Sequence, residues 1–452
     1  MICDIVEHSL DSLCLLVVDC PHATPEWTTE GFIVLRNQNI KGGRLDLAAP
    51  SYTDEAHYLG RIRRAAPQKD DIVITREAPM GEVCQIPEDL KCCLGQRQVL
   101  LRPNPDKVDS RFLLYALQSP YLQRQIGWNE GTGSTVSNLR IPVLKALKVP
   151  TPPIETQREI SSTLGSIDDR IALLRETNAN LEAIAQALFK SWFVDFGPVR
   201  AKAEGLVPEG MDEVTSGMFP DSFVESEQGL VPKGWRLVPF GELLIHTIGG
   251  DWGDETPGEK NYIHVAIIRG TDIPDLQSGA ANRVPLRYTS TKKLATRKLQ
   301  DGDLVLEVSG GSKDQPTGRA LYLTEALLGQ FDCPVAPASF CRLLRPSDRN
   351  TGLLLAQHLT YIYGIGKTWE YQNQSTGIAN FQTTHFLKNE LVAVPPREVL
   401  AVFADVVRSI VDRVHLSQIQ NLASLRDALL PRLISGQLRL PVAEEMVPEA
   451  CA

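Results

Sequence analysis

The segment GIGKT is the stretch of this sequence closest to a phosphate-binding motif. It runs from Gly364 to Thr368 and ends like the loop that holds the phosphates of ATP. That loop needs a glycine five residues before Gly366, where this chain has Tyr361. The segment GTGS, which begins at Gly131, is half of a dinucleotide fingerprint but has neither a predicted strand before it nor a helix directly after it. Both segments therefore favour turns over phosphate binding.

Metal and nucleophile chemistry is no better supported. The eight histidines include no H-x-x-x-H pair, and the sequence has no G-x-S-x-G elbow. The nine cysteines include no C-x-x-C pair, which predicts buried free thiols. Cys20 and His22 are close, but two ligands do not make a zinc site. Because the N-P-P-[FY] and D-P-P-Y sequences of amino-methyltransferases are absent too, any catalysis must come from another chain.

Length and composition indicate a folded protein with two or three cores. The chain has 452 residues, 43% hydrophobic and 22% charged. No stretch approaches the ~18 apolar residues of a membrane span. The start, MICDIVEHSLDSLC, is acidic where a secretory signal would be basic, so we expect no membrane association and a cytoplasmic location.

The formal net charge of -9 at first argues against a nucleic-acid partner. Its distribution weakens that argument. Residues 1–150 carry 17 Lys+Arg against 18 Asp+Glu, and residues 235–395 carry 16 against 16. Residues 201–234 carry 2 against 7. Two nearly neutral regions thus flank an acidic connector.

The chain contains an internal repeat of about 240 residues. The passage PPIETQREISSTLGSIDDRI (152–171) returns as PPREVLAVFADVVRSIVDRV (395–414). Three segments upstream recur in the second half in the same order: KDDIVIT as DGDLVLE, VLLRP as CRLLRP, and GSTVSNL as STGIANF. In each half, short apolar runs alternate with Gly, Pro, Asn and Asp clusters, and a long helix follows. We predict an α+β fold with two repeated globular α/β domains.

The two long helices carry a narrow apolar stripe at heptad spacing, which requires a partner helix. The stripe of the first is Ile160, Leu164, Ile167, Ile171, Leu174, Asn178 and Leu181; that of the second is Phe403, Val407, Ile410, Val414, Asn421 and Leu425. We predict that they pair as an antiparallel coiled coil related by a pseudo-two-fold axis; the alternative is two unrelated core helices. A buried Asn at the seam would fix the register, but Asn178 and Asn421 could equally face a partner or solvent. Pro431 should stop or kink the second helix.

Four segments in this order resemble the specificity (S) subunit of type I restriction-modification systems. They are DCPHATPEW (19–27), LEAIAQALFKSWFVDFGPVRAKAEG (181–205), GLVPKGW (229–235) and LRDALLPRLISGQLRL (425–440). The resemblance implies target-recognition domains at 1–151 and 235–394, a first central helix at 152–197, an acidic linker at 198–234, a second long helix with the C-terminal end at 395–440, and a tail at 441–452. The first domain lacks the P-x-G-W opening that the second has at 232–235, so an edge element could be short or missing there.

In that family the specificity subunit has no catalytic site. Each domain reads one half of a split double-stranded DNA target, and the coiled coil sets the gap and docks two methyltransferase subunits. Two restriction (motor-nuclease) subunits can join. The resemblance places S-adenosylmethionine in the methyltransferase, ATP and Mg²⁺ in any motor-nuclease, and no cofactor in this chain. The alternatives are the specificity portion of a single-chain restriction-methylase and an assembly scaffold without DNA readout.

Loops rich in base-reading and phosphate-binding side chains occur at matching places in both halves. In the first domain the candidate DNA-binding residues are Arg36, Asn37, Gln38, Asn39, Arg61, Arg63, Arg64, Gln96, Arg97, Gln98, Trp128, Asn129, Thr132, Ser134 and Thr135. In the second they are Arg269, Thr271, Arg287, Tyr288, Lys292, Lys293, Arg297, Lys298, Ser312, Lys313, Trp369, Tyr371, Gln372, Asn373, Gln374, Ser375 and Thr376. Each basic residue could instead be a solvated surface charge, and either Trp could be buried for structural reasons.

Overall fold

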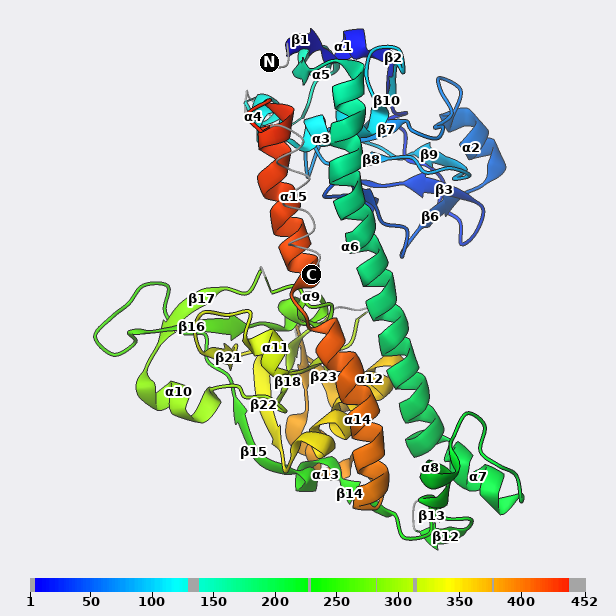
Figure 1. Ribbon diagram of the computed structural model, residues 1–452, viewed down its shortest axis with the longest axis vertical. Helices are drawn as coiled ribbons and strands as arrows, with labels where there is room; N and C mark the ends of the chain where they lie inside the picture. Colours follow the sequence, from blue (N-terminus) through cyan, green and yellow to red (C-terminus); the bar gives the residue numbers. More distant parts are fainter. Residues whose placement is uncertain are drawn as a thin grey trace. The chain divides into compact units, whose positions relative to one another are not determined.

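The repeat in the sequence corresponds to a repeat in topology. The computed structural model describes residues 5–128, 138–226, 229–281, 283–311, 315–375 and 378–438, with the side chains of 374, 375 and 378 left out. It divides the chain into two compact units, residues 1–171 with 421–452 (unit 1) and residues 172–420 (unit 2). Figure 1 shows the elements of both units.

Unit 1 contains a four-stranded antiparallel sheet and a three-stranded sheet. The first has the order β2-β10-β7-β8, formed by Cys14–Asp19, Gln98–Pro103, Ile72–Thr75 and Val83–Gln85. The second has the order β6-β3-β9, formed by Ser51–Thr53, Phe32–Leu35 and Cys92–Leu94, and only its β3-β9 pair is parallel. Strand β1 (Val6–Ser9) pairs with β11 (Lys148–Thr151), and β4 (Ile40–Lys41) with β5 (Arg44–Leu45).

Unit 2 has the same sheets in the same order. The four-stranded sheet β15-β22-β18-β20 consists of Leu244–Gly249, Cys341–Pro346, Leu304–Glu307 and Ala320–Tyr322, all antiparallel. The three-stranded sheet β17-β16-β21 consists of Leu286–Thr289, Ile263–Ile268 and Val335–Pro337, and again only one pair, β16-β21, is parallel. Strand β14 (Arg236–Pro239) pairs with β25 (Leu391–Val394). The α+β class and the duplication are therefore confirmed.

Unit 2 also has smaller sheets of its own. Strands β19 (Ser309–Gly310), β24 (Ile378–Phe381) and β23 (Gln372–Ser375) form an antiparallel sheet. Strands β12 (Phe223–Ser226) and β13 (Gly229–Pro232) form a hairpin. Together with α7 (Gly197–Ala203) and α8 (Glu213–Gly217), this hairpin lies within residues 198–234, which the sequence marks as a linker. Since Phe219 and Val231 are buried there, much of this segment is folded.

The short helices around the sheets also correspond. Unit 1 has α1 (Leu10–Leu13), η1 (Asn37–Asn39), α2 (Glu55–Arg61), α3 (Ser110–Gln118), α4 (Pro120–Gly127) and α5 (Ile141–Ala146); unit 2 has η3 (Phe240–Leu243), η4 (Gly270–Asp272), α9 (Ile273–Gln277), α10 (Thr291–Arg297), α11 (Glu325–Leu328), α12 (Arg349–Gly364), η5 (Lys367–Tyr371) and α13 (Thr383–Asn389). The Asp109 side chain caps the start of α3, as that of Asp348 caps α12. Both helices therefore begin with an aspartate N-cap.

A buried ion pair is repeated in both units. Arg102 donates from Nε and Nη2 to the two carboxylate oxygens of Asp71, at 2.9 and 2.8 Å. Arg345 binds Asp303 in the same bidentate way, at 2.7 Å for both bonds. Each carboxylate is 2% exposed. In each unit the pair joins the residue just before one strand, β7 or β18, to the neighbouring strand, β10 or β22.

The first long helix, α6, runs from Ile154 to Phe189. Its predicted seam residues Ile160, Leu164, Ile167, Ile171, Leu174 and Asn178 are all at most 7% exposed, and Leu181 is half-buried. Within unit 2, Asn178 contacts Val414, while Phe189, eleven residues later, contacts Phe403, eleven residues earlier. The two helices therefore pack antiparallel there.

The second long helix differs from the prediction because it is broken. It consists of α14 (Arg397–Val414) and α15 (Gln418–Ile434), with residues 415–417 between them. Phe403, Val407, Ile410 and Val414 on α14 are buried as predicted. After the break the buried stripe is shifted: Asn421 is exposed and Leu422 is buried, while Leu425 is half-buried. Helix α15 continues through Pro431 and ends before Gly436, whose φ is +72°.

Within unit 1, α15 packs on the first part of α6 through Asp168. The carboxylate of Asp168 lies 2.9 Å from Nη1 of Arg426 and 3.2 Å from Nη2 of Arg44. It also accepts a 2.7 Å hydrogen bond from the Tyr115 hydroxyl. Burial alone would raise the pKa of Asp168, but Arg426, Tyr115 and Arg44 more than offset it and lower the pKa.

The cores explain the cysteines. All seven cysteines in the described ranges are free, and five of them are buried. In unit 1, Cys20, Cys84 and Cys92 lie in one apolar cluster with Leu35 and Leu100. Burial raises the pKa of the Cys84 thiol to about 12, so it packs as a small neutral side chain. Unit 2 has an aromatic core that includes Phe189, Trp192, Phe193, Phe219, Trp235 and Phe403.

Candidate nucleic-acid interface

The loops at one end of unit 1 bring several predicted residues together around Glu77. The Glu77 carboxylate lies 3.0 Å from Nε of Arg97 and accepts a 2.9 Å bond from Asn138. The Asn37 amide donates to the Glu77 carbonyl at 2.6 Å. Nearby on the chain, the Arg36 guanidinium stacks on Trp27, with 5.2 Å from its carbon to the ring centre. These side chains form a polar loop surface with one exposed aromatic ring.

The turn between β9 and β10, Gly95–Gln98, contains three predicted residues, of which Arg97 contacts Glu77. Gly95 N donates to Leu35 O at 2.8 Å, and Arg97 O accepts from Arg76 N at 2.8 Å. Arg97 has a φ of +68°, the left-handed region that non-glycine residues rarely adopt. Its side chain is 57% exposed. Gln96 donates to His22 O and to Thr24 Oγ1, which ties the turn to the loop after β2.

Three other predicted residues of unit 1 have structural roles. Arg61 is 9% exposed and donates to the carbonyls of Leu94, Ala23 and Pro21. Asn39 and Gln98 are buried, and their amide oxygens accept from backbone N–H groups. These side chains hold the loops that carry the exposed residues through bonds to backbone groups, although the buried Nε2 of Gln98 has no hydrogen-bond partner among the described residues.

The remaining predicted residues of unit 1 lie on its surface or outside the described ranges. Gln38 and Arg63 are exposed, and Arg64 is exposed with a 3.3 Å bond to Asp19 O. Trp128, at the end of α4, is 80% exposed and therefore not a core residue. Asn129, Thr132, Ser134 and Thr135 lie outside the described residues.

In unit 2 the predicted basic cluster surrounds the loop after β15. Arg287 stacks on Trp252 at 4.9 Å and pairs with Glu255 at 3.0 Å. Lys293 pairs with Asp251 at 2.9 Å, and Arg297 donates to Gly249 O at 2.9 Å. Much of this positive charge is thus matched within the unit. The other members are also at the surface: Lys292 and Lys298 are exposed, and Tyr288 packs on His264.

The remaining predicted residues of unit 2 divide in the same way. Arg269 makes a bidentate pair with buried Asp272, and Thr271 is exposed. Tyr371 is buried and donates to Glu390, while Trp369 is 36% exposed. Gln372 accepts from Thr317, and the exposed Asn373 accepts from Gln382. Ser312, Lys313 and Thr376, and the side chains of Gln374 and Ser375, lie outside what the structure describes.

Three exposed aromatic residues of these loops were not predicted: Trp27, Trp252 and Phe340. Phe340 is 60% exposed, although Ala338 and Cys341 beside it are fully buried. It lies in the turn between β21 and β22, which is the counterpart of the Gly95–Gln98 turn. Ser312 and Lys313 were the predicted counterparts of Gln96, Arg97 and Gln98. Extending the VLLRP match backwards by two residues would have paired Arg97 with Phe340.

The segment GIGKT, which resembles the end of a phosphate-binding loop, has a structural role. Lys367 of GIGKT follows the end of α12 and lies 2.8 Å from Oε2 of Glu390. His358 contacts Oε1 of the same carboxylate at 2.8 Å. Burial alone would raise the pKa of Glu390, but His358, Lys367 and Tyr371 lower it to about 2. This lysine is therefore held by a buried carboxylate.

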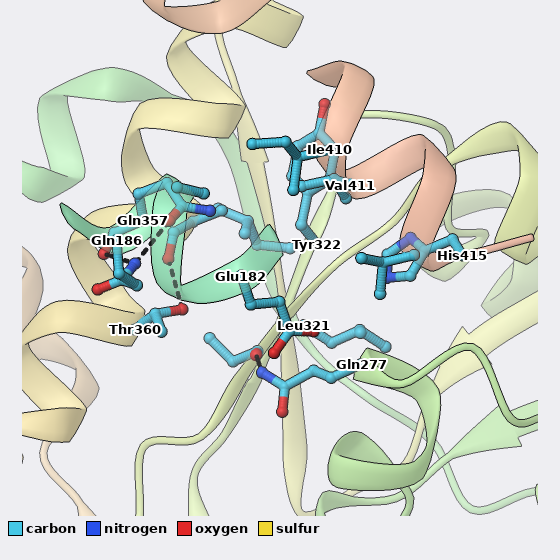
Figure 2. Close-up of a pocket in the computed structure, with 15 residues that line it drawn as sticks. Glu182, Gln186, Gln277, Leu321, Tyr322, Gln357, Thr360, Ile410, Val411 and His415 are labelled. Atoms are coloured by element: carbon cyan, nitrogen blue, oxygen red, sulfur yellow. Dashed lines mark hydrogen bonds between the residues drawn. The ribbon is translucent and has the colours of Figure 1, made fainter. Parts of the chain in front are cut away.

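A pocket in unit 2 lies between α6, α12 and α14 (Figure 2). Its polar lining includes three amides: Gln186 donates to Gln357 Oε1 at 2.6 Å, and Gln277 donates to Ala320 O. Glu182, Tyr322, Thr360 and His415 line it as well. Much of Glu182 is exposed, but its carboxyl is at the pocket, where burial raises its pKa to about 7. No group of three or more His, Cys, Asp or Glu in the described ranges is placed to hold a metal ion. The pocket is a packing gap between helices.

The repeated topology and the two polar loop surfaces define a protein with two equivalent binding domains. Residues 29–183 match the family described as type I restriction modification DNA specificity domain. The chain is 25% identical over 380 residues to the type I restriction enzyme MjaIX specificity subunit of Methanocaldococcus jannaschii, covering 82% of this chain and 78% of that protein. It is 26% identical over 433 residues to the HindI specificity subunit of Haemophilus influenzae, covering 84% and 88%.

A solved structure has the same fold. The S subunit of a type I restriction-modification system from M. genitalium gives a TM-score of 0.51 at 16% identity, covering 95% of this chain and 96% of that one. That likeness concerns the fold alone; in sequence, residues 29–183 match the DNA specificity domain family, and most of the chain is similar to type I restriction enzyme specificity subunits.

None of the helices in the described residues is long and apolar enough to cross a membrane.

Proposed function

We propose that this chain recognises a bipartite double-stranded DNA target, with one domain on each half. The observation that carries the proposal is the duplication itself. Two domains with one topology present loop surfaces at equivalent places, around Arg97 in the β9–β10 turn of unit 1 and around the β21–β22 turn of unit 2, which a backbone bond joins to the loop after β15. Arg, Asn, Gln and exposed aromatic side chains on loops are the groups that contact base edges and phosphates.

The long helices have two roles in this proposal. Helix α6 has 36 residues, which corresponds to about 54 Å at 1.5 Å per residue. A helix of this length, with partner helices packed along it, is stiff enough to set the number of base pairs between the half-sites. The helices also dock two methyltransferase subunits, to which two restriction subunits can be added.

The chemistry belongs to the partners in this proposal. The methyltransferase binds S-adenosylmethionine and modifies a base turned out of the duplex. The restriction subunit, where present, uses ATP and Mg²⁺. This chain supplies the sequence specificity and holds no cofactor, and it works in the cytoplasm, where the DNA target lies.

The proposal is tested by expressing the chain with its methyltransferase and sequencing the methylated bases. We expect one motif of two short half-sites separated by a fixed gap. Mass spectrometry of the purified complex should give two methyltransferase copies per chain. A single uninterrupted motif, or a methyltransferase that works equally well without this chain, would refute the proposal.

A further inference from the structure

The β9–β10 turn of unit 1 and the β21–β22 turn of unit 2 share three backbone hydrogen bonds, although Cys341 N bonds to Ala338 O while its counterpart Gln98 N bonds to the Cys20 sulfur. Gly95 N donates to Leu35 O, and Ala338 N donates to Ile268 O, both at 2.8 Å. Cys20 N donates to Gln98 O as Gly250 N donates to Cys341 O, at 3.1 and 2.9 Å. In each case the turn links the parallel strand of the three-stranded sheet to the central strand of the four-stranded sheet.

The residue at the tip is held by the same bond in both turns. Arg97 O accepts from Arg76 N at 2.8 Å, and Phe340 O accepts from Val308 N at 2.9 Å. The strand pairing thus places Arg97 and Phe340 at one structural position in the two repeats. The side chain of Arg97 is 57% exposed, and Phe340 as a whole residue is 60% exposed.

The tip residues differ in chemistry and in backbone conformation, since Arg97 has a φ of +68° whereas the φ of Phe340 is not positive. Arg97 is a planar cation with several donors, and Phe340 is an apolar ring. An exposed Phe contributes nothing to the core of unit 2, since Ala338 and Cys341 on either side are already buried. Different side chains at matching positions of two related turns are what two domains need to read different sequences.

The surroundings of both tips are polar and belong to the loop surfaces described above. Arg97 lies against Glu77, which also binds Asn37 and Asn138. Phe340 O also accepts from Ser309 N at 3.3 Å, and Ser309 pairs with exposed Asn380 across β19 and β24. The loop that carries Trp252 is joined to the β21–β22 turn through Asp251 N and Pro337 O.

We propose that this tip is a specificity-determining position in each repeat, with Arg97 reading a guanine in one half-site and Phe340 packing against a thymine methyl group in the other. Arginine donates to the O6 and N7 atoms of guanine, and an apolar side chain contacts the C5-methyl of thymine in the major groove. The inference rests on the proposed function, because it names residues that carry out that DNA reading.

The test uses the complex of the full chain with its methyltransferase and a DNA library randomised over both half-sites. Arg97→Ala should relax one base position in one half-site, with discrimination there reduced at least fivefold. Phe340→Ala should relax one position in the other half-site. Phe340→Arg should change the preference at that position from thymine to guanine, which a merely structural role would not produce.

Matched variants serve as controls. Arg158 has the same side-chain exposure as Arg97 (57%) and the same 3.0 Å carboxylate contact, but it lies on α6. Ile245 is a 68% exposed apolar residue at the far end of β15 from Gly249. Arg158→Ala and Ile245→Ala should leave both half-site motifs unchanged.

Two outcomes would overturn the inference about the tip residues, and a third would overturn the proposed function on which it rests. If Phe340→Ala weakens binding equally for all sequences, or if Phe340→Arg keeps the wild-type motif, the tip does not read bases. A wild-type complex that selects no bipartite motif would refute the proposed function instead. Circular dichroism of each variant checks its fold, and Phe340→Leu, which keeps an apolar tip, should retain the thymine preference.

Discussion

At the scale of single residues, His415 links stability to pH. It is 4% exposed, its Nδ1 lies 2.9 Å from Thr324 Oγ1, and burial lowers its pKa to about 4. The unfolded imidazole takes up a proton near pH 6.5, so the free energy of unfolding of unit 2 should fall by about 2 to 3 kcal/mol between pH 6.5 and 4 from this group. Glu182, whose pKa is raised, has the opposite effect. Its contribution makes the free energy of unfolding rise as the pH falls from 7 to about 4.5, the ordinary pKa of a glutamate.

Comparing variants isolates the histidine. His415→Gln should flatten the fall in stability between pH 6.5 and 4, measured by denaturant unfolding at several pH values. Glu182 and the other carboxyls are common to both proteins and cancel in the difference. His264→Gln, at an exposed position, should keep the wild-type slope. An unchanged slope in His415→Gln would show that this imidazole is not held neutral.

The repeated ion pair gives a second prediction at this scale. Asp71→Asn leaves Arg102 without a charged partner in a mostly buried site, which should cost unit 1 about 3 kcal/mol. Asp303→Asn should do the same to unit 2. Hydrogen exchange resolves the two units, and exposed Asp106→Asn is the control. If either variant reduced the hydrogen-exchange protection of both units equally, the two ion pairs would not stabilise their units independently.

Which polar residues face outward could not be predicted at this scale. Arg61, Asn39 and Gln98 have the same donors and acceptors as base-reading residues, but the fold uses them to hold backbone groups. Sequence shows the type of a side chain and not whether a nearby carbonyl already satisfies it. The internal repeat aligned loops of the two halves, but it set Ser312 and Lys313 in place of the β21–β22 turn.

At the scale of elements, Asn178 lies in the α6 seam opposite the end of α14. It is 7% exposed, and in the described part of the chain it reaches the partner helix through a long 3.5 Å contact with Val414 O. Because that bond is weak and the site is apolar, Asn178→Leu should stabilise unit 2 by about 1 kcal/mol in denaturant unfolding. Exposed Thr177→Leu is the matched control on the same helix. Destabilisation of Asn178→Leu would show that the amide is needed.

The sequence predicted the first long helix better than the second. The heptad stripe of α6 has no interruption, and every seam residue from Ile160 to Asn178 is buried. The break at 415–417 contains no Gly or Pro that would mark it. Contacts distant in sequence hold it instead: Gln330 donates to His415 O at 2.9 Å, and Gly279 lies so close that an added Cβ would be 2.6 Å from Val414 O.

At the scale of the whole molecule, the nearly neutral domains predict weak DNA binding by the isolated chain. Neutralised phosphates dominate the affinity of DNA-binding proteins and its dependence on salt. Much of the positive charge here is already paired, as in Arg287 with Glu255 and Lys293 with Asp251. Adding the methyltransferase should therefore increase the affinity and steepen the salt dependence. Equal affinity and equal slope with and without the partner would contradict this.

The measurement that tests the central claim most directly is the methylated motif of a chain with one heptad deleted from α6. Removing seven residues shortens a helix by about 10 Å, or roughly three base-pair steps of 3.4 Å. We predict that both half-site sequences are kept while the gap between them changes, by about three base pairs if the helix alone sets it. A motif with the wild-type gap would contradict the account of two readers joined by a helical spacer.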